Sequence, residues 1–234
     1  MKTRILFFIF SALMASSTLF AQLQVGFGGG ILMSGVESYS TQEGGSAILP
    51  SQTTYESRPG FQFHLPVQYK FSKYFAIQTE LSYMRHAYSS RERGSLPDQF
   101  VQLFDNETLY RNNVWSGSML ARLSTGGSLV SLHLVAGPTL GFMTTGNKEM
   151  DRSIVYMDGS SDRFSMARSY DVSESNFNQN LFGLTYGGGL TFGLPHYDLV
   201  LEARQFRAFD NMRIDQNIRM SNWSVNATVL FTIK

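Results

Sequence analysis

The 234-residue chain contains no cysteine. This absence excludes disulfide bonds, thiolate metal ligands and a lipid anchor attached through cysteine. Only four histidines occur, and no two of them have metal-ligand spacing, so the sequence predicts no metal site and no cofactor. After residue 21 there is also no run of 18 apolar residues, which leaves no candidate transmembrane helix.

The N-terminal segment has the order of charges and apolar residues that is typical of a secretory signal peptide. Lys2 and Arg4 precede the apolar stretch Ile5–Met14, and a region of small residues leads to Ala21-Gln22, the expected cleavage point. The apolar stretch is too short to span a membrane permanently. We therefore predict a signal peptide at residues 1–21 and one domain at residues 22–234.

The charge of that domain is nearly balanced. Lys2 and Arg4 are the only charged residues before position 22, so 17 of the 19 basic residues remain against 18 acidic ones. A balance of this kind predicts no general affinity for nucleic acid.

Aromatic residues and glycine are abundant, with 19 Phe, 11 Tyr and 21 Gly, and they occur in alternating patterns. Within residues 61–71, Phe61, Phe63 and Leu65 begin one apolar face, while Gln62 and His64 begin a polar one. Strict alternation predicts a β-strand. Its eleven residues are the length that a tilted strand needs to cross a membrane, whereas strands of soluble proteins average about 5–6 residues.

Alternation recurs in eight segments, separated by connections that are short and long in turn. The segments are residues 23–33, 61–71, 75–83, 115–123, 130–142, 182–194, 199–204 and 223–233. Short connections fall at 72–73, 125–128 and 195–197, and long ones at 35–57, 89–108, 144–179 and 210–218. This pattern predicts an all-β fold, an eight-stranded antiparallel up-and-down transmembrane β-barrel of the bacterial outer membrane, with periplasmic termini and long outer loops.

The alternative is a soluble β-sandwich or a lipocalin-like barrel, which would bury the apolar face inside. The opposite face is made of Gly, Ser, Gln and Thr, which would pack poorly as a core but suit a narrow polar lumen. Strand length and the asymmetry of the connections also favour the membrane barrel.

Several motifs resemble the PorT-like outer-membrane β-barrel family. Residues 58–83 open with Pro59-Gly60-Phe61 and close with Glu80-Leu81-Ser82-Tyr83, and later strands carry Ala136-Gly137-Pro138 and Leu201-Glu202-Ala203-Arg204. Residues 113–117 depart from the Tyr-Leu-Glu-x-Pro of the family's fourth strand. The resemblance implies the barrel fold and the outer membrane; one branch of the family assists protein secretion, and the departure questions membership of that branch.

Charged residues on the polar face are the candidate lumen site. Glu80, His133, Glu202 and Arg204 fall at similar depths in their strands, and His64, Lys70 and Arg122 are expected to extend the set. An eight-stranded barrel encloses only enough room for side chains, and buried charges need partners. We interpret the set as a structural salt-bridge network, with a proton or ion path as the alternative.

Basic residues gather in the predicted outer half. Arginine forks suit phosphate groups, so lipopolysaccharide contact is one interpretation, and a solvated mixed-charge surface is the other. The candidate contact residues are Arg85, Arg91, Arg93, Arg111 and Arg207.

Three functions follow from these patterns. The first is a structural or interaction barrel whose outer loops contact a protein partner in the envelope, as an accessory of a secretion or surface complex. The second is a narrow channel for small solutes. The third is a lipid-modifying enzyme, for which His86, Ser89, Ser90 and Asp98 near the outer rim supply a minimal acyl-transfer set without a nucleophile motif. We predict no catalytic residue.

Overall fold

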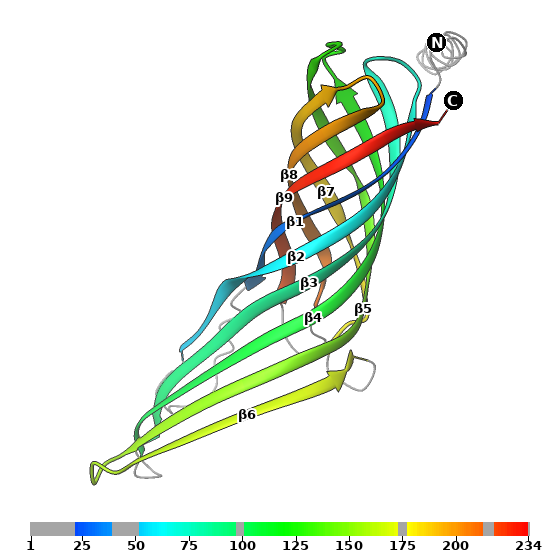
Figure 1. Ribbon diagram of the computed structural model, residues 1–234. Coiled ribbons are helices and arrows are strands. Elements are labelled where there is room, and N and C mark those ends of the chain that lie inside the picture. Colours follow the sequence, from blue (N-terminus) through cyan, green and yellow to red (C-terminus); the bar gives the residue numbers. More distant parts are fainter. Residues whose placement is uncertain (1–21, 39–51, 97–100, 173–176, 213–217, 234) are drawn as a thin grey trace, which may run out of the picture.

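The computed structural model of the protein describes residues 22–38, 52–96, 101–172, 177–212 and 218–233. These ranges form nine antiparallel strands (Figure 1). The predicted signal peptide lies outside the described residues. The strands are β1 Gln22–Ser38, β2 Gln52–Lys70, β3 Phe75–Leu96, β4 Val101–Ser124, β5 Val130–Tyr156, β6 Ser161–Asp171, β7 Asn180–Gly193, β8 Tyr197–Asn211 and β9 Ile218–Ile233.

Eight of the strands close into a ring, which confirms the predicted barrel. Neighbours around the ring are β1, β2, β3, β4, β5, β7, β8 and β9, and β9 returns to pair with β1. The β4–β5 and β5–β7 pairings complete the wall. Among the described residues, no helix is long and apolar enough to cross a membrane.

The two ends of the barrel differ. At one end, which we call the turn end, β2 and β3 are joined by a tight turn in which Ser72 Oγ accepts hydrogen bonds from the Tyr74 and Phe75 amides. The next turn contains Gly126 with φ of 77°, a left-handed conformation that glycine adopts without strain. Both termini of the described barrel lie at the turn end (Figure 1).

At the opposite end, β2, β3, β4 and β5 continue beyond the ring and β6 joins them, so that a twisted sheet protrudes from the barrel (Figure 1). We call this the protruding sheet; it comprises the parts of β2–β5 beyond Ser57, Tyr88, Asn112 and Thr145, with β6. The predicted long loops at 89–108 and 144–179 are therefore wrong as loops: most of their residues are strand, and β6 is a ninth strand that the sequence pattern did not predict.

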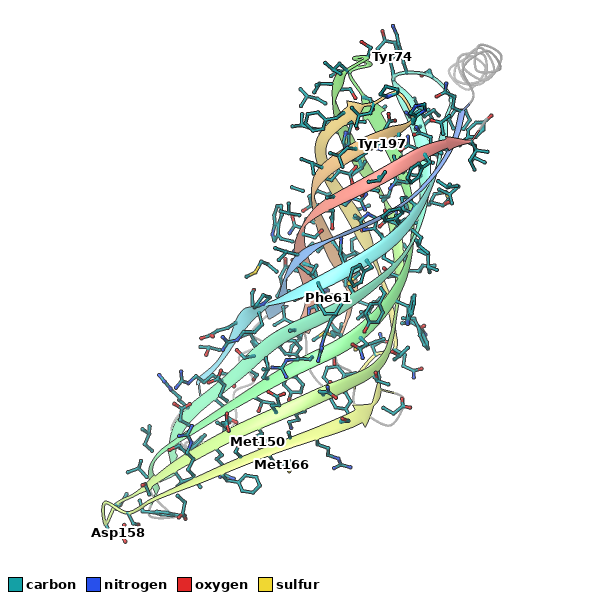
Figure 2. The ribbon with its side chains drawn as sticks, viewed as in Figure 1. Phe61, Tyr74, Met150, Asp158, Met166 and Tyr197 are labelled. Carbon is teal, nitrogen blue, oxygen red and sulfur yellow. The ribbon has the colours of Figure 1, made fainter. Side chains whose placement is uncertain are left out.

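Apolar residues cover the outside of the barrel, as alternation requires of a wall that faces lipid. Figure 2 shows side chains projecting from the whole wall, with Tyr74 and Tyr197 at the turn end and Asp158 at the tip of the protruding sheet. Exposed apolar side chains of the barrel include Phe27, Ile31, Phe63, Leu65, Leu81, Trp115, Met119, Leu132, Leu140, Trp223 and Val225.

Candidate functional site

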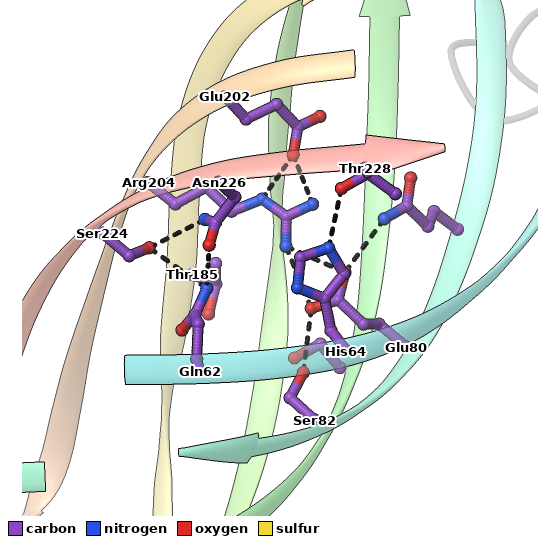
Figure 3. A network of polar contacts seen from close by, with 12 residues as sticks. Gln62, His64, Glu80, Ser82, Thr185, Glu202, Arg204, Ser224, Asn226 and Thr228 are labelled. Carbon is purple, nitrogen blue, oxygen red and sulfur yellow. Dashed lines mark hydrogen bonds and ion pairs between the residues drawn. The ribbon is translucent and has the colours of Figure 1, made fainter. Parts of the chain in front are cut away.

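A buried ion network crosses the middle of the lumen, centred on Arg204 of β8 (Figure 3). Arg204 Nη1 donates to both carboxylate oxygens of Glu80 on β3, at 3.0 and 2.8 Å. Arg204 Nε donates to Glu202 Oε2 at 2.6 Å. Ser82 and Gln78 add hydrogen bonds to Glu80 at 2.9 and 3.0 Å. One guanidinium thus joins two carboxylates from opposite walls, and all three charges are nearly inaccessible to solvent.

A second arginine continues the network toward the turn end. Arg122 of β4 donates to Glu202 Oε1 at 2.5 Å and to Gln68 Oε1 at 2.6 Å. His133 Nε2 of β5 lies 2.7 Å from the same Glu202 oxygen, and its Nδ1 lies 3.1 Å from Thr191 Oγ1. Two arginines therefore balance two glutamates at the centre of the barrel, and the hydrogen bonds satisfy most of their polar atoms.

Below this centre the network reaches a cavity of about 210 Å³ at the turn end, which Gln68, Lys70, Arg122 and Asp198 help to line. Gln68 donates to Gln24 at 3.0 Å, and Gln24 donates to Asp198 at 2.9 Å. Lys70 pairs with Asp198 at 2.7 Å. Sequence reasoning missed Asp198, because it lies one residue into β8, where alternation had not yet begun.

His64 lies in the same layer of the lumen but bonds to a hydroxyl group. Its Nε2 is 2.7 Å from Thr228 Oγ1, and it is buried against β1 and β9. A Cβ added at Gly28 would lie 2.4 Å from His64 Nε2, so glycine at this position leaves room for the imidazole. Beside it, Gln62 donates to Asn226 Oδ1 at 2.5 Å (Figure 3).

Beyond Glu80, toward the protruding sheet, the side chains that fill the lumen change from charged and polar to mainly apolar. From this level to the protruding sheet, apolar side chains of the described residues pack across it, and we call them the apolar plug. Tyr88 stacks on Tyr110 with ring centroids 4.9 Å apart, and Tyr110 meets Phe177 edge-on at 5.8 Å. The plug comprises Leu32, Met84, Tyr88, Tyr110, Val114, Met143, Val172, Phe177, Leu181, Phe206, Ala208, Met212, Ile218 and Met220.

The arginines considered for lipopolysaccharide lie on the protruding sheet (Arg91, Arg93 and Arg111) and on the adjoining barrel wall (Arg85 and Arg207), and most already have acidic partners. Arg91 donates to Asp105 from Nε at 2.8 Å and from Nη2 at 2.5 Å, and Arg93 donates to the same carboxylate at 3.0 Å. Arg111 pairs with Glu149, and Arg207 pairs with Glu37 at 2.8 Å. Arg85 sits on β3 between Phe61 and Asn113.

The residues considered for acyl transfer do not assemble. His86 is fully buried in the lumen, where its Nε2 lies 3.3 Å from the Gly35 carbonyl oxygen. Ser89, three residues further along the strand, is on the opposite face and accepts a hydrogen bond from Arg58 Nε at 3.2 Å. Asp98 lies outside the described residues. Within the described part of the chain, no group of three or more His, Asp or Glu residues is placed to hold a metal ion.

Comparisons with known proteins bear on this architecture. The family described as outer membrane protein beta-barrel domain matches residues 16–213. No curated protein matches the sequence.

Solved structures similar to the chain include three bacterial surface barrels. Ail of Yersinia pestis, solved with the heparin analogue sucrose octasulfate, is 15% identical with a TM-score of 0.36, and the match covers 90% of this chain and 99% of that one. Neisserial surface protein A is 14% identical with a TM-score of 0.40, over 89% and 97%. OprG of Pseudomonas aeruginosa is 12% identical with a TM-score of 0.40, over 91% and 95%.

Proposed function

We propose that this chain, which belongs to the outer membrane protein beta-barrel family and resides in the bacterial outer membrane, is a non-conducting barrel that works through its protruding sheet. The observation that carries the proposal is the filled lumen. The ion network occupies its middle and the apolar plug occupies the half next to the protruding sheet. Ions or solutes could pass through the barrel only if both the ion network and the apolar plug were displaced.

The orientation follows from the same asymmetry. Outer-membrane barrels have short periplasmic turns and long outer extensions. We therefore place the turn end and both termini in the periplasm, and the protruding sheet outside the cell. The mature domain would begin at Gln22, after removal of the signal peptide.

In this proposal the lumen residues act structurally. Glu80, Glu202, Arg122 and Arg204 form a set of equal and opposite charges, and a buried set of this kind fixes how the strands lie relative to one another. His133 extends the set by its contact with Glu202, and Lys70 extends it toward the turn end by its ion pair with Asp198. His64 lies beside the set and bonds to Thr228. The alternative role of an ion path would need the charged centre to exchange with water on both sides.

A narrow channel is the second candidate, and the 210 Å³ cavity at the turn end favours it. This cavity ends at Gln68 and Arg122, where the ion network begins. Recording the purified protein in planar bilayers separates the two functions. We expect no reproducible single-channel steps, whereas steps that disappear in Glu80→Gln would establish the ion path and overturn the filled-lumen proposal.

Two finer assignments belong to this proposal. The PorT-like motifs suggest a protein partner in the envelope, which the protruding sheet would contact. Lipopolysaccharide contact would begin at Arg85, since Arg91, Arg93, Arg111 and Arg207 would first have to exchange their carboxylate partners for phosphate. Arg85→Ala should then weaken binding of purified lipopolysaccharide in detergent, with Arg93→Ala as the paired control.

A further inference from the structure

Strand β6 forms one side edge of the protruding sheet, and residues 161–169 of this strand are exposed along their whole length. Among the described strands, β6 pairs with β5 alone, from Ser161 to Asp171 and without a shift in register. An exposed strand edge is a template for pairing with another chain. Proteins often protect such an edge with charged side chains, with Pro or with a β-bulge. This segment contains no Lys, no Pro and no bulge, and its charged side chains are Asp162, Arg163, Arg168 and Asp171.

The sequence of β6 is complementary to itself when two copies run antiparallel about Ser165. In that register Phe164 lies opposite Met166 of the second copy, and Asp162 lies opposite Arg168. These four residues share one face of the strand, because they alternate with period two. Phe164 and Met166 are 55% and 42% exposed, so pairing would remove apolar surface from water. Opposite charges directly across strands add to the stability of such a pair.

We propose that the β6 edge, Ser161–Ser169, binds the same edge of a second copy of this chain as an antiparallel strand pair. This proposal rests on the proposed function, in which the protruding sheet makes the contacts of the protein. It adds the identity of the partner, a second copy of the chain. A single strand pair is a small interface, so many copies in parallel would supply the strength of the contact.

Symmetry decides where the second copy lies. Antiparallel edge strands are related by a two-fold axis perpendicular to the sheet, and the protruding sheet continues the barrel wall, so this axis is perpendicular to the barrel axis (Figure 1). Such an axis reverses the barrel. The two copies must therefore belong to two membranes that face each other, and this pairing would connect neighbouring cells or vesicles.

The dimensions permit this arrangement. β5 leaves the ring at Phe142, and Asp151, opposite Ser165, is nine residues further. At about 3.3 Å per residue and a tilt of about 45°, the symmetry axis stands roughly 20 Å above the barrel rim, so two rims would be roughly 40 Å apart. The tip at Tyr156 would reach roughly 33 Å, which is short of the facing barrel.

Charge exchange in vesicles tests the proposal. Lipid vesicles carrying the full mature chain, with the protruding sheet accessible to added protease, should cluster. Asp162→Arg and Arg168→Asp should each reduce clustering at least tenfold, because each places like charges across the axis twice. Mixing vesicles of the two variants should restore it, because both cross-pairs are then Arg with Asp. No clustering by the unchanged protein, or clustering that neither variant alters, would overturn the proposal.

Cysteine crosslinking tests the register, since the chain has no cysteine of its own. Ser165→Cys should give dimers with a short bifunctional maleimide between two vesicle populations. Arg163→Cys and Ala167→Cys should crosslink only when mixed, because these positions face each other across the axis. Dimers that form only within one vesicle would also overturn the proposal. Bilayer conductance is measured separately. A conducting barrel would contradict the proposed function, but it would not affect the outcome of the clustering and crosslinking experiments.

Discussion

The barrel and the protruding sheet are built from the same strands, but their faces are exchanged. On β4, Trp115 and Met119 point outward in the barrel while Ser116 and Arg122 point into the lumen. Further along the same strand, Asp105 and Glu107 are the outward residues, and Phe104 and Tyr110 are the buried ones. The outward side is therefore apolar in one part and charged in the other.

This exchange marks a change of solvent. A wall that faces lipid places apolar groups outside and its polar groups inside, whereas a sheet in water does the reverse. The register shift of the β4–β5 pair between Asn112 and Val114 lies at the change. Figure 2 shows Phe61 on the barrel wall near this level, with Met150 and Met166 beyond it on the protruding sheet. We expect the outer surface of the membrane to lie here.

The largest effect is expected from breaking the charged centre of the barrel. Arg204→Ala would leave Glu80 without its ionic partner and weaken the pairing of Glu202. Removing one member of a buried ion set costs about 3–5 kcal/mol. Urea unfolding in lipid vesicles measures the loss. The double variant Glu80→Gln with Arg204→Met should lose less, because Glu202 keeps Arg122; equal losses would contradict the structural role of the network.

A matched pair of substitutions on β4 sharpens the comparison of solvents. Met119 and Leu103 have the same outward side, and they are 54% and 47% exposed. Met119→Arg should cost about 2–4 kcal/mol if the residue lies deep in lipid. Leu103→Arg should change stability by about 0.5 kcal/mol or less, because it lies in water. If the two substitutions lowered the free energy of unfolding equally, the membrane boundary would not lie at the register shift.

The barrel could be predicted from the sequence because lipid imposes one rule on every strand. Alternation identified the eight ring strands and the polar side of each. Similar depth then identified Glu80, His133, Glu202 and Arg204 as candidates, and the structure brings these residues into one connected set.

The protruding sheet could not be predicted in this way. On β5 the buried residue Met143 is followed by the buried residue Gly146, three positions later, so the period of two is broken. Beyond Gly146, the outward residues of the strand are polar, so outward and inward positions differ little in hydrophobicity. A sequence of this kind is typical of a loop. The apolar plug was missed for another reason: Val172, Phe177 and Met212 come from connections, and only the closed ring brings them together.

The smallest effect is expected from the exposed ion pairs of the protruding sheet, such as Arg91 with Asp105. The hydrogen bonds from Arg91 hold the pKa of Asp105 below its ordinary value. A carboxyl whose folded pKa is lowered contributes stability above its unfolded pKa, and the contribution disappears as the pH falls through the lowered value. Exposed pairs contribute about 0.2–1 kcal/mol. Asp105→Asn should therefore speed amide exchange in the outer parts of β3 and β4 at neutral pH.

The same variant should match the unchanged protein once the pH has fallen below the lowered pKa of Asp105, after correction for intrinsic exchange, because the carboxyl is then neutral in the folded and the unfolded state. High salt should also reduce the difference, since this pair is accessible to ions. Glu80→Gln is the control in the barrel: its pair is shielded from salt, so its effect should persist. If salt weakened both effects equally, the solvent around the two ion pairs would be the same, and the division into a lipid-facing barrel and a water-exposed sheet would fail.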